Sequence, residues 1–243
     1  MSKIYVVGMG PGSMEDMTPR AKKALGDSDY IAGYFRYIEY IKEHFPDKEF
    51  IESNMKKEVE RCRAVLEKAL EGYTVSLVSS GDSGIYGMAG LMLEVLKRSK
   101  AQISVEVIPG ITAVSAAASL LGAPLMHDFS VISLSDLLTP LELIKKRIEC
   151  AVKGDFVICF YNPKSKNRSN YINEARDIIL RYKSGATPVG IVTNAGRAGE
   201  SIVVTDLESM LSFEINMFTV VIVGNSKTYV ENGRIITPRG YIF

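Results

Sequence analysis

The fold is decided by residues 75–89, which read Val-Ser-Leu-Val-Ser-Ser-Gly-Asp-Ser-Gly-Ile-Tyr-Gly-Met-Ala. An apolar, strand-like run stops at small residues around a single acid, Asp82, and a helix-like segment then begins. Open α/β sheets bind small molecules at the carboxyl ends of their strands, where glycines let a ligand approach the backbone closely. Because Gly and Asp are also ordinary turn residues, the meaning of this stretch depends on the rest of the chain.

The composition is that of a globular protein. The chain has 243 residues, of which 47% are hydrophobic and 23% charged, so it is long enough for one large domain or two smaller ones. Its 29 basic and 28 acidic residues give a net charge of +1, and no basic run stands out. A chain without a positive field is not expected to bind nucleic acid.

The cysteines and histidines favour a reducing compartment and no protein-bound metal. Cys62, Cys150 and Cys159 form neither an even framework nor a CxxC spacing, and His44 and His127 are too few for a His-rich metal site. No basic-then-apolar leader opens the chain, and no apolar run reaches the roughly 18 residues of a membrane span. We therefore expect a cytoplasmic protein without a membrane partner.

The first half of the chain alternates strands and helices. Short apolar runs predict five strands, at residues 3–7, 30–33, 50–52, 75–78 and 104–108. The clearest helix shows one apolar face that ends at Gly72 and is made of Val59, Cys62, Val65, Leu66, Ala69 and Leu70. Such alternation predicts parallel strands joined by right-handed crossovers, with ligand loops at their carboxyl ends.

A second series of elements begins after Gly122-Ala123-Pro124 breaks the pattern. We expect strands at residues 129–133, 155–161, 189–193, 201–204 and 219–223, and helices at 141–152 and 171–182. The last three strands lie too close together for full helices between them, which favours a mixed sheet with a hairpin-like return. The sequence thus predicts two α/β domains, residues 1–122 with a parallel sheet and 123–243 with a mixed sheet, and an interdomain cleft for a ligand.

The loop after the first strand, Gly8-Met9-Gly10-Pro11-Gly12, superficially matches a dinucleotide fingerprint. It neither completes G-x-G-x-x-G nor offers GK[ST], and Pro11 removes an N–H, so a phosphate cradle is not expected. Thr18-Pro19 then provides a helix N-cap and a proline at the first helical position.

The loop after the fifth strand, Pro109-Gly110-Ile111-Thr112-Ala113, leads into a helix rich in small residues. Small side chains allow close packing and leave room for a flat ring such as adenine.

Taken in order and with their spacings, these loops make the chain similar to the tetrapyrrole methylases, which transfer methyl from S-adenosylmethionine to corrin and sirohaem precursors. The resemblance covers essentially all of the chain. In the first half it rests on residues 8–12 and 18–20, the Gly81-Asp82-Ser83-Gly84 turn and residues 109–113. Motifs in the second half are similar to the branch that methylates C17 of precorrin-3B or cobalt-factor III and contracts the macrocycle, and they lie at residues 133–140, 160–165, 193–197, 223–226 and 237–241.

The resemblance implies that the methyl donor folds up in the interdomain cleft. The donor contacts that it implies are Pro11, Gly81, Asp82, Ile85, Thr112 and Ala113 from the first domain and Tyr161, Ala195 and Thr219 from the second. The carboxylate of Asp82 is able to accept hydrogen bonds from the donor and to favour its sulfonium charge. The alternative role of Asp82 is that of a capping or Asx-turn acid.

Methyl transfer needs no activated side chain, but ring contraction needs an additional acid or base, or a neighbouring substrate carboxylate. Candidates near the expected cleft are Asp136, Ser135, Ser133 and His127, although a lone histidine at a strand start is more often structural. The acetate and propionate groups of the substrate are expected to meet basic side chains. Those to inspect are Arg20, Lys164, Lys166, Arg168, Arg197 and Arg239, each of which has the alternative role of a solvated surface charge.

The resemblance further implies a homodimer, and any cobalt would belong to the substrate. Two alternatives remain. One is another methylase of the corrin pathway, acting for example at C11 or C20; the other is a non-catalytic nucleotide-binding regulatory module. Binding of S-adenosylmethionine or its demethylated product, as opposed to ATP or NAD, distinguishes the enzyme from the module.

Overall fold

The computed structural model describes residues 2–165 and 169–242. The chain divides into two units, residues 1–113 and 114–243. The boundary expected after residue 122 would place the helix that follows the fifth strand in the first unit, whereas this division places it in the second. No helix in the described part of the chain has the length and apolarity needed to cross a bilayer. The elements of the first unit are β1 (Lys3–Gly8), α1 (Pro19–Gly26), β2 (Tyr30–Tyr34), α2 (Phe35–Ile41), η1 (Lys42–His44), β3 (Glu49–Ser53), α3 (Glu58–Leu70), β4 (Val75–Ser79), α4 (Ala89–Ser99) and β5 (Ser104–Ile108).

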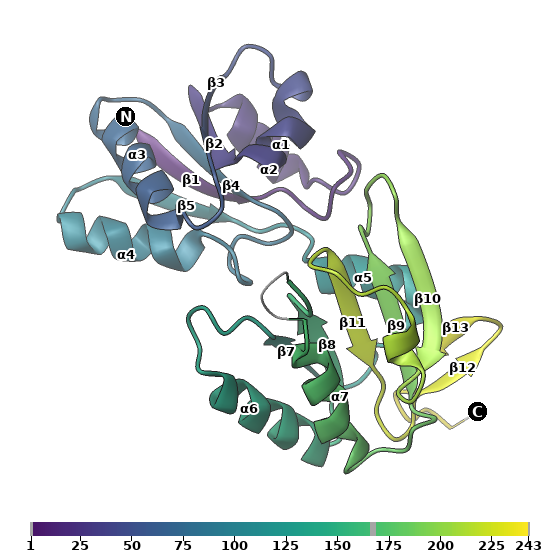
Figure 1. The fold of residues 1–243 in the computed structure, drawn as a ribbon. Helices are drawn as coiled ribbons and strands as arrows, with labels where there is room; N and C mark the ends of the chain where they lie inside the picture. Colours follow the sequence, from purple (N-terminus) through teal and green to yellow (C-terminus); the bar gives the residue numbers. More distant parts are fainter. Residues whose placement is uncertain (1, 166–168, 243) are drawn as a thin grey trace. The chain divides into compact units, whose positions relative to one another are not determined.

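The first unit is a parallel sheet between two layers of helices (Figure 1). Its five strands pair in the order β3-β2-β4-β1-β5, and every pair is parallel, as the alternation of strands and helices predicts. One face packs against α3 and α4, and the other against α1 and α2, each through its own buried apolar cluster. The parallel arrangement brings the carboxyl ends of all five strands to one edge of the sheet.

Two residues of the apolar face expected for helix α3 are exposed. Cys62, Val65, Leu66 and Ala69 are buried as expected, but Val59 and Leu70 are 43% and 61% exposed. The expected apolar face also contains an arginine, Arg61, which is only 4% exposed. Helix α1 begins as predicted, because the Thr18 hydroxyl accepts a hydrogen bond from Ala21 N at 3.1 Å and Pro19 occupies the first turn.

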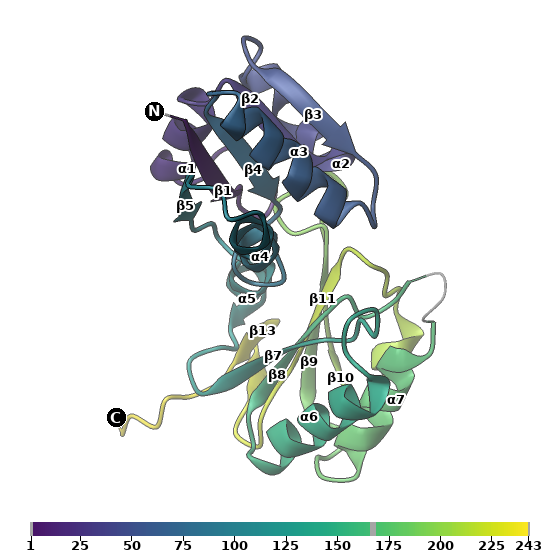
Figure 2. The same cartoon turned by 90° about the vertical axis from the view of Figure 1, so that its left-hand side faces the viewer.

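The second unit contains a mixed sheet, as predicted (Figure 2). Its five strands run in the order β10-β9-β11-β8-β7; β7 and β8 are parallel, while β8-β11, β11-β9 and the β9-β10 hairpin are antiparallel. The elements of this unit are α5 (Ala113–Leu121), β6 (Gly122–Ala123), β7 (Phe129–Ser133), α6 (Leu141–Lys153), β8 (Val157–Tyr161), α7 (Tyr171–Leu180), β9 (Pro188–Thr193), β10 (Ser201–Asp206), η2 (Met210–Ser212), β11 (Thr219–Val223), β12 (Tyr229–Glu231) and β13 (Arg234–Ile236).

Helices α6 and α7 pack on one face of this sheet through a cluster that includes Ile148, Phe160 and Ile179. Leu121 of α5 packs so tightly on the sheet that a Cβ at Gly190 would lie 2.3 Å from its Cδ1. A small three-stranded sheet, ordered β12-β13-β6, lies next to β9. It was not predicted, because strands of two or three residues are too short to show a period.

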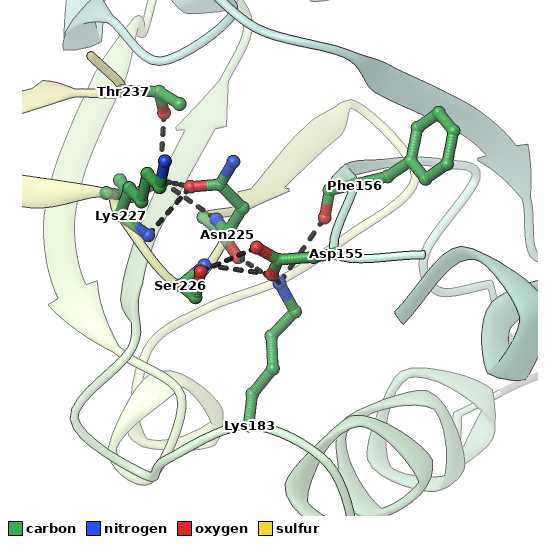
Figure 3. Close-up of polar contacts among 9 residues, drawn as sticks. Asp155, Phe156, Lys183, Asn225, Ser226, Lys227 and Thr237 are labelled. Carbon is green, nitrogen blue, oxygen red and sulfur yellow. Dashed lines mark hydrogen bonds and ion pairs between the residues drawn. The ribbon is translucent and has the colours of Figure 1, made fainter. Parts of the chain in front are cut away.

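The amino end of β8 is held by a buried lysine (Figure 3). Lys183 donates hydrogen bonds to Asp155 Oδ1 at 2.9 Å and to the Gly224 carbonyl at 3.1 Å, and Ser226 Oγ donates to Asp155 Oδ2 at 2.6 Å. Burial opposes ionisation of Asp155, but the hydrogen bonds from Ser226 and Lys183 outweigh it and lower its pKa. The backbone of Asp155 has a φ of 55°, so β8 begins at Val157 and not at residue 155 as predicted.

Candidate active site

Three glycine loops meet at the carboxyl edge of the first sheet. Gly10 and Gly81 exchange two backbone hydrogen bonds, of 3.0 and 2.7 Å, which join the loops after β1 and β4. A Cβ at Gly110 would lie 2.2 Å from the Gly81 carbonyl oxygen, and a Cβ at Gly8 would lie 2.7 Å from Gly110 N. No side chain fits between backbones at these distances, so only glycine permits this assembly.

The carboxylate of Asp82 holds this assembly together. Its Oδ1 accepts hydrogen bonds from Gly84 N at 2.8 Å and Ile85 N at 3.2 Å, which closes an Asx-type turn. Its Oδ2 accepts a third from Gly110 N at 2.9 Å, in the loop after β5. Both carboxylate oxygens of Asp82 therefore accept hydrogen bonds from backbone N–H groups. This geometry is that of an Asx-turn acid, which is the alternative role that the sequence left open for Asp82.

The segment that follows Asp82 is tightly constrained. Ser83 is buried and donates its hydroxyl to the Ile108 carbonyl at 3.1 Å. Tyr86 has a φ of 54°, a conformation that an aromatic residue rarely adopts, and a Cβ at Gly87 would lie 2.4 Å from the Ser83 carbonyl oxygen. This fixed backbone leaves Ile85 and Tyr86 exposed, at 41% and 57%. Strain of this kind concentrates at ligand sites.

The donor contacts expected from the first domain lie in this assembly. Pro11 is buried and follows Gly10, while Ile85 is part of the Asp82 turn. The backbones of Thr112 and Ala113 lie beside Gly81, since a Cβ there would be 3.6 Å from Thr112 Cα and 3.5 Å from Ala113 N. Their contact with a methyl donor stays a prediction.

The donor contacts expected from the second domain lie at one end of the mixed sheet. Tyr161 ends β8, and its hydroxyl accepts a hydrogen bond from Val114 N at 2.9 Å. Buried Thr219 begins the neighbouring antiparallel strand β11, and its hydroxyl lies 2.8 Å from that of Thr193, its register partner at the end of β9. Ala195 stands two residues beyond Thr193 in the following loop.

Three of the four candidates for proton transfer gather at the same end of this sheet. Ser133 ends β7, and its Oγ accepts hydrogen bonds from Asn162 Nδ2 at 3.0 Å and from Ser135 N at 3.2 Å. Asp136 Oδ2 accepts a hydrogen bond from the Tyr171 hydroxyl at 2.7 Å. Ser135 and Asp136 are half-buried.

His127 does not belong to this group. It precedes β7, whereas Ser133 ends it, and the four strand steps from Phe129 to Ser133 at about 3.3 Å each separate the two ends of β7 by roughly 13 Å. Its Nδ1 accepts a hydrogen bond from Asp128 N at 2.8 Å and lies 3.6 Å from Asp128 Oδ2. Proximity in sequence to Ser133 suggested a shared site, and the extension of the strand separates them.

The basic candidates are scattered. Arg20 is 59% exposed and donates a hydrogen bond to Glu106 Oε1 at 2.7 Å, as a surface ion pair does. Lys164 is exposed just beyond β8, and Arg197 is half-buried in the loop between β9 and β10. Arg239 is exposed beyond β13, a strand of the small three-stranded sheet, whereas Tyr161 ends β8 in the five-stranded sheet. Lys166 and Arg168 lie outside the described residues.

Arg61 was not among the site residues predicted from the sequence. A signal was present in the sequence, because Arg61 lies on one stripe of α3 with Val65 and Ala69, four and eight residues later, and an arginine is unusual on such an apolar stripe.

No group of three or more His, Cys, Asp or Glu side chains in residues 2–165 and 169–242 is arranged to hold a metal ion.

Comparison with known proteins identifies the family of this chain. The family model for tetrapyrrole (corrin/porphyrin) methylases matches residues 3–211. The chain is 51% identical over 238 residues to a probable cobalt-factor III C(17)-methyltransferase of Salmonella typhimurium, covering 98% of this chain and 99% of that protein. It is 50% identical over 243 residues to the cobalt-factor III methyltransferase of Priestia megaterium, of which it spans 45%.

Among solved structures, the crystal structure of the methyltransferase CobJ superposes with a TM-score of 0.91 at 34% identity, covering 98% of this chain and all of that one. This agreement extends over both units and confirms the two α/β domains, with a parallel and a mixed sheet. Since the family model covers most of the chain and relatives are half identical over nearly all of it, this chain belongs to the tetrapyrrole methylases.

Proposed function

We propose that this chain is an S-adenosylmethionine-dependent C-methyltransferase of corrin biosynthesis, which methylates C17 of precorrin-3B or cobalt-factor III with contraction of the ring. The observation that carries the proposal is the 51% identity to the Salmonella protein, which this chain matches almost from end to end. The relative from Priestia is more than twice as long, so its other segment contributes nothing to the proposal.

The residues of the first unit suit the methyl donor. Gly8, Gly81 and Gly110 let three loop backbones pack against one another at the carboxyl edge of the sheet, which is the edge where open α/β sheets bind ligands. The carbonyls and N–H groups of this backbone provide hydrogen bonds without side chains. We assign the donor to Pro11 and to the backbone of residues 81–85 and 112–113, with Tyr161, Ala195 and Thr219 as further contacts from the second unit.

When bound, the donor supplies an already activated sulfonium methyl group. The protein is left to orient the acceptor carbon and to exclude water, and such positioning is worth roughly 7–11 kcal/mol. In the first unit Asp82 serves this end by fixing two loops with three hydrogen bonds. In the second unit, Asp136 is the side chain with the chemistry to accept a proton, and the Tyr171 hydroxyl orients it.

Lys164 and Arg197 are our choice for the carboxylates of the macrocycle. Both stand in loops that follow the strands which end beside Thr219, and Arg197 is half-buried there. A guanidinium binds a carboxylate with two parallel hydrogen bonds, while an ammonium acts as a point charge. Arg20 and Arg239 are weaker choices, since the first is occupied by Glu106.

The proposal includes a homodimer that acts in the cytoplasm, without a protein-bound metal and without nucleic acid or membrane as partners. The net charge of +1 gives no field for a polyanion, and three cysteines without a pairing pattern suit a reducing compartment. Light scattering coupled to size exclusion tests the dimer, and elemental analysis of the purified protein tests the metal. A monomer, or a stoichiometric metal ion, contradicts the corresponding part.

Calorimetry tests the enzyme against the regulatory module. We expect binding of S-adenosylhomocysteine at one site per chain and no binding of ATP or NAD. Binding of ATP or NAD without affinity for S-adenosylhomocysteine contradicts the proposed function.

A further inference from the structure

A buried cation without an anionic partner lies across the carboxyl edge of the first sheet. Arg61 is only 4% exposed, yet its three nitrogens donate to neutral groups: Nε to Ser53 Oγ at 2.6 Å, one terminal nitrogen to the Asn54 carbonyl at 3.1 Å and the other to Met88 Sδ at 3.6 Å. Within the described ranges, no carboxylate forms an ion pair with it. A buried charge is costly unless it is paired, so this arrangement requires an explanation.

The supporting contacts place the guanidinium beside the candidate donor site. Ser53 ends β3, and its register partner Tyr34 ends β2. Met88 opens α4 directly after the Asp82 segment, and its N–H donates to Ser79 Oγ at the end of β4, at 3.1 Å. Because β3, β2 and β4 are neighbours in the sheet, Arg61 spans the ends of three strands on the edge that carries the glycine loops.

The electrostatics favour an added negative charge. Burial lowers the pKa of Arg61, and the charge of Glu58 in the same helix offsets only part of this effect. The Glu58 carboxylate instead accepts a hydrogen bond from Lys56 N at 3.0 Å. The guanidinium has five N–H bonds, and the three contacts use one on each nitrogen. Each terminal nitrogen therefore has one N–H without a hydrogen bond to residues 2–165 and 169–242, and a carboxylate accepts two such bonds from a guanidinium.

An aromatic cluster begins at Tyr34, the register partner of the Ser53 that accepts a hydrogen bond from Arg61. The ring of Tyr34 meets those of Phe35 and Tyr37 edge to face, with centroids 4.8 and 5.3 Å away, and Arg36 lies 5.9 Å from the Phe35 ring centroid. Tyr34, Phe35 and Tyr37 are half-buried at the junction of β2 and α2. The burial of Arg61 strengthens a charge-assisted hydrogen bond to its guanidinium, because water is kept away from it.

We propose that Arg61, held by Ser53, Asn54 and Met88, binds a carboxylate of a ligand at the carboxyl edge of the first sheet. The inference rests on the proposed function, in which two ligands carry that group: the amino-acid end of the methyl donor and the acidic side chains of the macrocycle. Both present the same planar anion, and the guanidinium fork is complementary to it.

Isothermal titration with three probes separates the two sources. The probes are S-adenosylhomocysteine, methylthioadenosine, which lacks the amino-acid carboxylate, and cobalt-factor III. Arg61→Met replaces the guanidinium with an apolar chain, and Arg63→Met, two residues further along α3 on its exposed surface, is the matched control. If Arg61 binds the donor, the variant loses roughly tenfold or more in affinity for S-adenosylhomocysteine and keeps its affinity for methylthioadenosine.

If Arg61 binds the macrocycle, the loss of tenfold or more falls on cobalt-factor III, and both nucleosides keep their affinity. Arg61→Lys covers the case in which the methionine variant does not fold: it keeps the charge but not the fork, and we expect a several-fold loss for the same ligand. Unchanged affinity for all three probes overturns the inference, and so does an equal loss for all three together with a lower melting temperature. Failure of the wild-type protein to bind S-adenosylhomocysteine contradicts the proposed function instead.

Discussion

Replacing Asp82 separates two roles that its carboxylate could have in binding the donor. In one, the charge attracts the sulfonium directly; in the other, the carboxylate acts through the loops that it holds. The structure favours the second role, because Oδ1 accepts from Gly84 N and Ile85 N, and Oδ2 accepts from Gly110 N. The perturbation that tests this is Asp82→Ala, with Asp82→Asn as the variant that keeps shape and one acceptor oxygen.

The magnitude follows from the three hydrogen bonds. Those to Gly84 N and Ile85 N are exposed, so water replaces the carboxylate there at little cost. The bond to Gly110 N is partly buried, and a hydrogen bond to a charged acceptor contributes about 1.5–3 kcal/mol. We therefore expect Asp82→Ala to weaken donor binding by about 1–3 kcal/mol, which is roughly 5- to 150-fold in Kd. Asp82→Asn should fall between this variant and the wild type.

The assay is titration calorimetry with S-adenosylmethionine and, separately, S-adenosylhomocysteine. These ligands differ in the positive charge on sulfur, so a role through the loops predicts equal losses for both. A loss for S-adenosylmethionine that exceeds the loss for S-adenosylhomocysteine by tenfold or more refutes the reasoning and places the carboxylate next to the sulfonium. Unchanged affinity for both removes Asp82 from the site.

Three further changes test other parts of the structure. Gly110→Ala should abolish binding of S-adenosylhomocysteine and lower the melting temperature, because its Cβ would lie 2.2 Å from the Gly81 carbonyl oxygen. The control is Gly90→Ala, in open space on α4, which should stabilise the folded protein by about 0.5–1 kcal/mol. Equal behaviour of the two variants contradicts the close approach of the loop backbones. The lowered pKa of Asp155 means that its contribution to stability is present above its ordinary value of 3.8 and is lost as pH falls through the folded-state pKa. Urea unfolding of Asp155→Asn should therefore differ from wild type at pH 7, and the difference should shrink as pH falls below 3.8; a constant difference excludes this linkage. Lys164→Met and Arg197→Met should weaken binding of cobalt-factor III by roughly tenfold while sparing S-adenosylhomocysteine; losses for both ligands, with a lower melting temperature, indicate unfolding.

The sequence predicts most of the fold because its strands carry their own period. The bounds of β5, β7 and β11 are those expected, and the short spacing of the last strands correctly indicates an antiparallel return. The alternation predicts a helix between β2 and β3 but does not give its bounds, because α2 follows β2 without a loop and Tyr34 and Phe35 belong to different elements in one aromatic run.

The candidate site is predictable only where its determinants are local. The glycines and Asp82 lie in turns whose chemistry is written in a few adjacent residues, and the structure does bring these turns together. The third partner of Asp82 is Gly110, which stands 28 residues away, and a pattern cannot show that contact. The place of Arg61 on the apolar stripe of α3 was visible in the sequence, but its contacts were not, since its partners Ser53 and Met88 lie outside that helix.

The most direct test of the account is methyl transfer itself. The purified protein is incubated with S-adenosylmethionine labelled in its methyl group and with cobalt-factor III or precorrin-3B, and the product is analysed by mass spectrometry and NMR. We predict one labelled methyl group per macrocycle, located at C17, in a ring-contracted product. Label at C11 or C20 would assign the chain to another step of the corrin pathway, and no transfer to either macrocycle by a protein that binds the donor would contradict the proposed activity.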